Sequence, residues 1–193
     1  MKSIYLILDM QNDLVHADGP NGKSPLGEQV RSRKVVEKTA AALKKARDAG
    51  IAVGFVRVGF SEGYPECPKN SPVFGGAQKA GLFKLGAFGT EIHPDLKQQP
   101  GDVHVTKRRV SPFYSTTLMA QLSAGGIERI YCSGVSTQAV VQATVRDGHD
   151  RDFEMVVIED ASCAHSDEEH KNSMGSIARF CKVVTVDTVD FSS

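Results

Sequence analysis

The sequence has 193 residues, with 23 Lys or Arg and 23 Asp or Glu, so its formal net charge is zero. This length suffices for one domain with a sizeable core, and we expect a single domain over residues 1–193. The balanced charge predicts no basic surface for nucleic acid and no acidic tract of the kind typical of disorder.

The first apolar run, SIYLILDM, is too short to cross a bilayer and lacks a small-residue cleavage site. We therefore expect neither a membrane span nor a signal peptide. The cysteines are scattered without CxxC spacing and predict no disulfide framework; they are Cys67, Cys132, Cys163 and Cys181. These features together favour a cytoplasmic protein.

Short apolar runs alternate with amphipathic runs along the chain. The runs that predict strands are Ile4–Asp9, Ile51–Arg57, Val103–Lys107, Ile130–Ser133, Met155–Glu159 and Val183–Val186. Most are apolar on both faces, as the central strands of a parallel sheet are. The runs that predict helices are Val36–Ala46, Thr116–Ala124, Thr137–Gly148 and Ser166–Phe180. This alternation predicts an α/β fold with a parallel sheet and helices on both faces.

The exception to the alternation is the long Gly/Pro-rich stretch Val58–Gly101. Loops of this length in compact domains are usually functional or carry short elements of their own. The stretch is rich in aromatic residues, namely Phe60, Tyr64, Phe74, Phe83 and Phe88. These rings either wall a pocket or anchor the loop to the core, and both readings stay open.

Charged residues end two of the predicted strands. Ligands of open parallel sheets bind beyond the carboxyl ends of the strands. Asp9 follows an almost wholly apolar run, where a carboxylate without a partner would be costly, and Lys107 ends another strand. Taken singly, Asp9 is better explained as a turn cap and Lys107 as a solvated lysine. Taken together, they predict a charged pair in a shared site.

The turn GVSTQAV, residues 134–140, lies between a predicted strand and a helix. Backbone amides at such a turn, here those of Ser136 and Val140, stabilise an anion or a developing oxyanion whatever side chains they carry. Val140 stands where a nucleophile would be well placed, yet it has no chemistry. The plainer reading of Val140 is core packing.

With these strand ends assembled, the sequence resembles the isochorismatase-like (cysteine hydrolase) superfamily. The matching blocks, in order, are LDMQNDL, GTEIHPDL (89–96), KRRVSPFYSTTL (107–118) and GVSTQAVVQATVRDGHDRDFEMVVIEDA (134–161). The resemblance implies a three-layer, doubly wound, six-stranded parallel sheet. It also implies hydrolysis of a small molecule by a homodimer or homotetramer.

The amidase members of that superfamily use an Asp, a Lys and a Cys, which match Asp9, Lys107 and Val140. The resemblance also implies a non-proline cis peptide bond at Val135–Ser136. A valine cannot form a thioester, so amide hydrolysis through a Cys is disfavoured. The isochorismatase branch lacks the Cys and cleaves a vinyl ether by protonation from the Asp and addition of water, which needs an acid and a pocket.

We therefore hypothesise a Cys-independent hydrolase of a small molecule, with Asp9 as acid or base, Lys107 beside it, and vinyl-ether hydrolysis as one candidate reaction. The motif GVSTQA differs from the motif GVYAH of the named isochorismatases, so a related hydrolase with another substrate is favoured. The alternative is an inactive pseudoenzyme or binding module that retains the pocket. An engineered Cys-to-Val change is disfavoured, because Ser or Ala is the usual choice to disarm a thiol.

The candidate substrate-binding residues are Gln11, Phe60, Arg109 and Phe113. Two of these residues have an equally good alternative explanation: Phe113 as a core residue and Arg109 as a solvated surface residue. We predict no metal, since residues 57–67, where some nicotinamidase-like relatives carry histidine ligands, contain no histidine. We predict no cofactor either, because neither a Gly-rich phosphate loop nor a dinucleotide fingerprint occurs.

Overall fold

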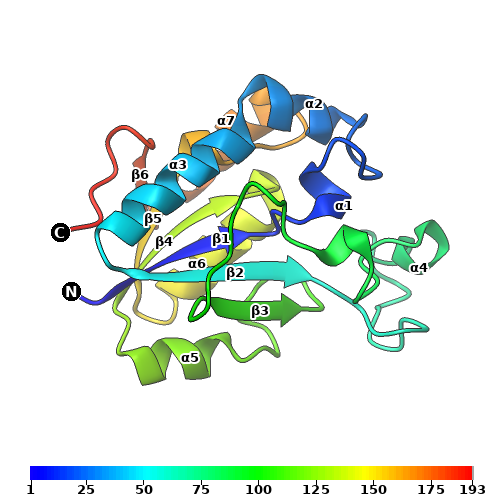
Figure 1. Cartoon of the computed structure of the whole chain (residues 1–193), viewed down its shortest axis with the longest axis horizontal. Helices are drawn as coiled ribbons and strands as arrows, with labels where there is room; N and C mark the ends of the chain where they lie inside the picture. The colour runs from blue at the N-terminus through cyan, green and yellow to red at the C-terminus, as the bar shows by residue number, and fades with distance from the viewer. Residues whose placement is uncertain (193) are drawn as a thin grey trace.

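The computed structural model describes residues 1–192 and has at its centre a six-stranded sheet in the order β3-β2-β1-β4-β5-β6 (Figure 1). All neighbouring strands are parallel. The strands are β1 (Ser3–Leu8), β2 (Ala52–Val58), β3 (Val103–Lys107), β4 (Arg129–Gly134), β5 (Glu154–Ile158) and β6 (Lys182–Val184). The predicted doubly wound parallel sheet is confirmed.

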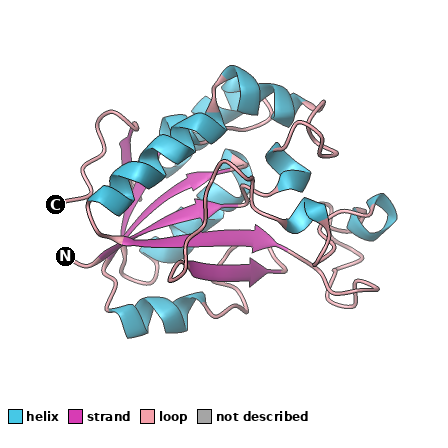
Figure 2. Cartoon of the chain, viewed as in Figure 1, coloured by secondary structure: helices cyan, strands magenta, loops and turns pink. Residues whose placement is uncertain are grey.

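Helices cover both faces of the sheet (Figure 2). They are α1 (Asn12–Val15), α2 (Pro25–Ser32), α3 (Val35–Asp48), α4 (Ala77–Ala80), α5 (Leu118–Gly125), α6 (Gln142–His149) and α7 (Asp167–Ile177), with shorter turns η1 (Phe88–Thr90), η2 (Thr137–Val141) and η3 (Glu159–Ala161). The α2 helix was not predicted, although Ser24 caps its first turn and Pro25 occupies its first position, which is a typical helix start. None of the helices in residues 1–192 combines the length and apolar character needed to cross a membrane.

The central strand β1 is buried along its whole length, as a strand covered on both faces must be. Tyr5 and Ile7 pack in the core that includes α3, whereas Leu6 and Leu8 pack in the core that includes α5, α6 and α7. This alternation follows from the two-residue period of strand side chains. Residues at the carboxyl end of β1 are thus held from both sides.

The stretch between β2 and β3 carries α4 and η1 and forms a third apolar cluster of its own. Its members are Val58, Phe60, Tyr64, Cys67, Phe74, Ala77 and Phe83. The part of this stretch that carries α4 lies at the end of the molecule toward which the arrows of β1, β2 and β3 point (Figure 1). This part therefore lies beyond the carboxyl ends of the strands, which is where ligands of such sheets bind.

Candidate active site

Asp9 and Lys107 form an ion pair at the carboxyl end of the sheet. Asp9 directly follows β1 and Lys107 ends β3, so the two strands flank β2 and their ends lie close together. Asp9 Oδ2 lies 2.9 Å from Lys107 Nζ, and the two residues are only 4% and 1% exposed. The ammonium also donates to the carbonyl oxygen of Arg109 at 3.1 Å. The predicted charged pair is present.

Only one carboxylate oxygen of Asp9 has a hydrogen-bond partner. Oδ2 is bound by Lys107, but Oδ1 is buried and has no partner among the described residues. Burial raises the pKa of Asp9 above its ordinary value, while the charge and hydrogen bond of Lys107 act in the opposite direction. Such a group is suited to hold a proton at Oδ1 and to release it to a bound molecule.

The turn after β4 is held against the end of β1, directly beside Asp9. Gly134 has φ 141°, and a Cβ there would lie 2.0 Å from the carbonyl oxygen of Leu8, so the position requires glycine. The Val135 amide donates to that same oxygen at 3.1 Å. The peptide bond Val135–Ser136 is cis, as the resemblance implied.

Val140 lies in the π-helical turn η2 and is 2% exposed. Two side-chain contacts support this turn. Thr137 Oγ1 lies 2.9 Å from His170 Nδ1, and His170 Nε2 lies 2.9 Å from Glu159 Oε2. No spacing in the sequence signals that His170 meets Thr137.

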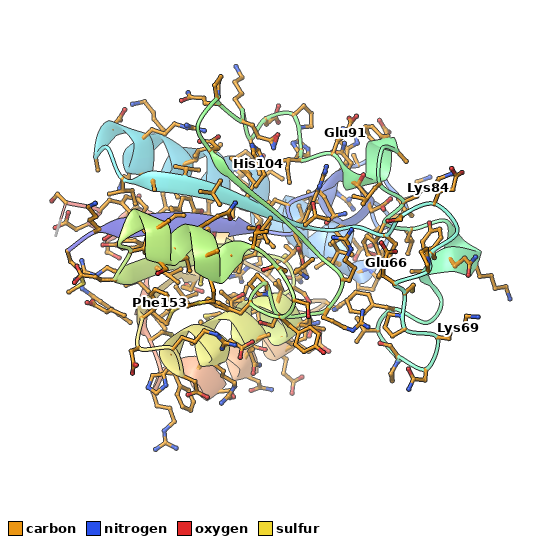
Figure 3. The ribbon with its side chains drawn as sticks, turned by 90° about the horizontal axis from the view of Figure 1, so that it is seen from below. Glu66, Lys69, Lys84, Glu91, His104 and Phe153 are labelled. Atoms are coloured by element: carbon orange, nitrogen blue, oxygen red, sulfur yellow. The ribbon has the colours of Figure 1, made fainter. Side chains whose placement is uncertain are left out.

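These elements enclose a cavity of about 440 Å³ that is mostly apolar. Asp9, Lys107, Ser136 and Val140 are among its walls. The remaining walls come from α1, the segment before and into α2, the stretch between β2 and β3, and nearby turns, and they are Leu14, Asn21, Leu26, Val58, Pro72, Val73, Phe74, Leu82, Phe83, Val110, Val135, Ala139 and His165. Glu66, Lys69 and Lys84 of the stretch lie at this end of the molecule, away from Phe153 (Figure 3).

Gln11 and Phe60 do not line the cavity. The Gln11 side chain is fully buried and exchanges hydrogen bonds with the backbone of Val58, donating from Nε2 at 3.0 Å and accepting at Oε1 at 2.8 Å. The Phe60 ring packs inside the third cluster, 5.8 Å from the rings of Tyr64 and Phe74. The structure thus gives both side chains partners within the protein, and Phe74, rather than Phe60, reaches the cavity wall.

Arg109 and Phe113 are also outside the cavity wall. Arg109 donates from Nη1 to the carbonyl oxygens of Glu66 and Arg108, at 3.1 and 2.6 Å. Phe113 is a core residue that stacks on Phe153 at 6.1 Å, which agrees with the plainer of its two readings. The predicted site residues therefore separate into a group that meets at the cavity and a group that supports its surroundings.

None of the four cysteines supplies a nucleophile to the cavity, because none belongs to its wall. Burial raises the pKa of Cys163 to about 12 and that of Cys181 to about 11, so both stay as thiols at neutral pH. Within residues 1–192 no three His, Cys, Asp or Glu side chains are grouped to hold a metal ion. The expectation of a metal-free site stays a prediction.

A model of the isochorismatase domain matches residues 3–188 of the chain. The chain belongs to the isochorismatase family. It is 31% identical to the uncharacterized isochorismatase family protein YecD of Escherichia coli O157:H7, over 95% of this chain and 92% of YecD. It is 29% identical to the ureidoacrylate amidohydrolase RutB of Caulobacter vibrioides (strain ATCC 19089 / CIP 103742 / CB 15), over 96% and 88% of the two chains.

Solved structures of the isochorismatase family share the fold. The N-carbamoylsarcosine amidase of Thermoplasma acidophilum matches with a TM-score of 0.79 and 25% identity, covering 98% of this chain and 99% of that one. A cysteine hydrolase of Pseudomonas syringae pv. phaseolicola matches with a TM-score of 0.85 at 20% identity, covering 96% and 89%. Family membership and these relatives support a hydrolase in general.

Proposed function

We propose that this isochorismatase-family protein hydrolyses a small molecule without a protein nucleophile, using Asp9 to transfer protons. The observation that carries the proposal is the Asp9 carboxyl group, which is bound at Oδ2 by Lys107 and left without a protein partner at Oδ1 beside an apolar cavity. Val140, which the resemblance matches to the nucleophilic Cys of the amidase members, belongs to the cavity wall. The proposed site thus favours acid–base chemistry over a route through a thiol.

Vinyl-ether hydrolysis is the candidate reaction that needs least from such a site. Protonated Asp9 donates its proton to the terminal carbon of the C=C bond, which leaves an oxocarbenium ion. The Asp9 carboxylate then takes a proton from the water that adds to this ion. The resulting hemiacetal or hemiketal breaks its C–O bond to release an alcohol and a carbonyl compound. Lys107 stabilises the ionised form of Asp9 between the two proton transfers.

The backbone amides of Ser136 and Val140 are proposed to position an oxygen atom of the substrate or of the attacking water. Both residues belong to the cavity wall, and the turn that carries them is held against β1 by the bond from the Val135 amide to Leu8. Donors fixed in this way need little reorganisation when a ligand binds.

The alternative is a binding module that keeps the cavity without turnover. Val140 favours it, because that side chain adds no chemistry to the wall. Against it stands the buried Asp9–Lys107 pair, since burying two charges is costly and well-packed apolar residues often serve stability as well or better. A catalytic role of the Asp9–Lys107 pair would explain why the protein keeps two buried charges.

The test is a panel of vinyl ethers, amides and carbamoylated small molecules, assayed with the wild type and Asp9→Asn. We expect Asp9→Asn to lower the turnover of any hydrolysed compound by about 10²- to 10⁴-fold, the usual contribution of a general acid or base. Asp150→Asn is the matched control, because the side chain of Asp150 is 78% exposed and lies outside the cavity wall.

Circular dichroism and thermal unfolding would verify that both variants fold. Turnover that survives in folded Asp9→Asn would place the acid or base elsewhere. Binding of panel compounds to the wild type with no turnover of any of them would favour the binding module.

A further inference from the structure

Among the described wall residues of the cavity, Lys107 is the only Lys or Arg and Asp9 is the only Asp or Glu. The Lys107 ammonium lies 2.9 Å from Asp9 Oδ2, so its charge is offset when Asp9 is ionised. One further donor of the Lys107 ammonium is engaged by the Arg109 carbonyl oxygen. With two of its three donors engaged in this way, the ammonium already binds Asp9, and a bound carboxylate would compete with Asp9 for it.

The arginines that follow Lys107 in sequence are directed away from the cavity. Arg108 lies 3.6 Å from the carboxylate of Glu66, and Arg109 donates to the carbonyl oxygens of Glu66 and Arg108. Both arginines line a separate surface groove together with Pro65, Cys67 and Tyr114. They supply no charge to a molecule inside the cavity.

His165, the remaining ionisable member of the wall, is already offset by polar neighbours. Its Nδ1 lies 2.5 Å from Gln138 Nε2 and 3.8 Å from Glu169 Oε2, and its side chain is 50% exposed. The His165 ring thus faces Gln138, Glu169 and solvent. It is thus an unsuitable counter-ion for a buried ligand.

Most of the remaining wall is apolar, with aromatic and aliphatic side chains on several sides, and its polar members are Ser136 and Asn21. Phe74 and Phe83 come from the stretch between β2 and β3, and Val140 comes from η2. Among the polar members, Asn21 has its Nδ2 engaged by the carbonyl oxygen of Asp13 at 2.9 Å. Moving a carboxylate from water into such surroundings is costly, whereas an uncharged apolar body gains from burial.

We propose that the cavity binds an uncharged small molecule with a largely apolar body and excludes carboxylates. The proposal rests on the proposed function only in that it takes this cavity as the substrate site. It deepens that function by naming the substrate class: a neutral compound whose reactive group meets Asp9 and whose body packs against Phe74, Phe83 and Val140.

The test is direct binding of two probes of nearly equal shape, 4-ethoxybenzamide and 4-ethoxybenzoate, measured by isothermal titration calorimetry on the full chain. Neither probe carries a vinyl ether, so the measurement does not depend on the proposed turnover. We expect the neutral amide to bind at least about tenfold more tightly than the carboxylate, and each factor of ten is about 1.4 kcal/mol. Equal or tighter binding of the carboxylate, or no binding of either probe at millimolar concentration, would overturn the proposal.

A second variant tests the reason for the preference. Leu82 belongs to the cavity wall and is only partly buried, so it tolerates a longer side chain. Leu82→Arg adds the missing cation, and we expect it to strengthen 4-ethoxybenzoate binding at least about fivefold relative to the amide. Leu82→Gln is the matched uncharged control and should leave the preference unchanged.

The binding results and the assay of Asp9→Asn separate the two ideas. Preference for the neutral probe together with surviving turnover in Asp9→Asn contradicts the proposed mechanism alone. Preference for the carboxylate together with lost turnover in Asp9→Asn contradicts the substrate class alone.

Discussion

Two walls of the same cavity are built in different ways. One wall consists of strand ends and the turn after β4, and it carries Asp9, Lys107 and Val140, each at most 4% exposed. The other wall belongs to the stretch between β2 and β3, which contributes Phe74, Leu82 and Phe83. The strand-end wall holds the ionisable pair, and the opposite wall supplies apolar surface.

The two walls are also held by different interactions. Strand pairing aligns Leu8 with Val56 and Val58 with Lys107, so the ladder itself sets the distance between Asp9 and Lys107. The opposite wall is held by its apolar cluster and by scattered bonds, such as those from the Phe60 amide to the Phe83 carbonyl oxygen and from the Phe83 amide to Asp13 Oδ2, both at 2.7 Å. Reactive groups thus lie on the rigid part of the molecule, and the shape of the cavity depends on the part that varies more easily.

After Asp9→Asn, the largest expected effect comes from Val140→Cys, which adds a thiol to the strand-end wall. If the amide donors and the charged pair are competent for acyl transfer, the variant should gain amidase or esterase activity at least about tenfold above the wild type, or about 1.4 kcal/mol of transition-state stabilisation. Initial rates on the amide and ester members of the panel measure it.

Val141→Cys is the matched control for the added thiol, because Val141 is fully buried in the core and lies outside the cavity wall. It should gain no activity. Folded Val140→Cys without any gain would indicate that the strand-end wall is shaped for a reaction other than acyl transfer.

Next in size is the effect of Lys107→Met on pH dependence. Burial raises the pKa of Asp9 and Lys107 opposes that rise, so removing the ammonium lets Asp9 keep its proton to a higher pH. With protonated Asp9 as the working form, the falling limb of kcat/KM against pH should move to higher pH. A limb that stays in place or moves downward would contradict the proposed role of the pair.

Lys84→Met serves as the control for Lys107→Met, since Lys84 is 46% exposed and pairs with Glu62 on the surface.

The pH dependence of stability gives an independent readout of Asp9. Asp9 binds its proton more tightly in the folded chain than in the unfolded chain, so the free energy of unfolding should fall as pH rises from the unfolded pKa through the folded pKa. In Lys107→Met this fall should extend to a higher pH.

A smaller effect is expected from Asp13→Ala, which loosens the opposite wall. Asp13 is 6% exposed, and its loss leaves the buried Phe83 amide without an acceptor. The free energy of unfolding should drop by about 1–3 kcal/mol, the typical cost of an unsatisfied buried donor. Urea denaturation measures that cost, and faster hydrogen exchange of the Phe83 amide would locate it.

Asp13→Asn keeps an oxygen acceptor in the same place and should retain most of the stability. Binding of 4-ethoxybenzamide should weaken in Asp13→Ala and change little in Asp13→Asn. Equal loss in both variants would mean that the negative charge of Asp13, and not its hydrogen bond, holds the wall.

The smallest effect is expected from Arg109→Ala. The Arg109 side chain donates to the carbonyl oxygens of Glu66 and Arg108 on the surface, and Lys107 binds the backbone of Arg109, which the substitution keeps. KM for a hydrolysed panel member should change less than about twofold, within the roughly 0.5 kcal/mol usual for surface substitutions. A large rise in KM would indicate that Arg109 contacts the substrate after all.

Much of the strand-end wall was predictable from sequence, and little of the opposite wall was. The runs before Asp9 and Lys107 are apolar enough to predict buried parallel strands, whose carboxyl ends must share one edge of the sheet. In the stretch between β2 and β3, Phe60 and Phe74 are equally aromatic and neither lies on a strand or helix. Without a regular period, nothing in the sequence indicates which ring faces the cavity.

The sequence by itself determined the α/β order, the strand ends that carry Asp9 and Lys107, and the absence of a thiol at Val140, because these follow from periodicity and residue identity. Only the tertiary structure decided that Gln11 bonds the Val58 backbone rather than a ligand, and that Oδ1 of Asp9 has no partner among the described residues. Side-chain direction and hydrogen-bond pairing depend on contacts between segments far apart in the chain, and a local pattern does not encode them.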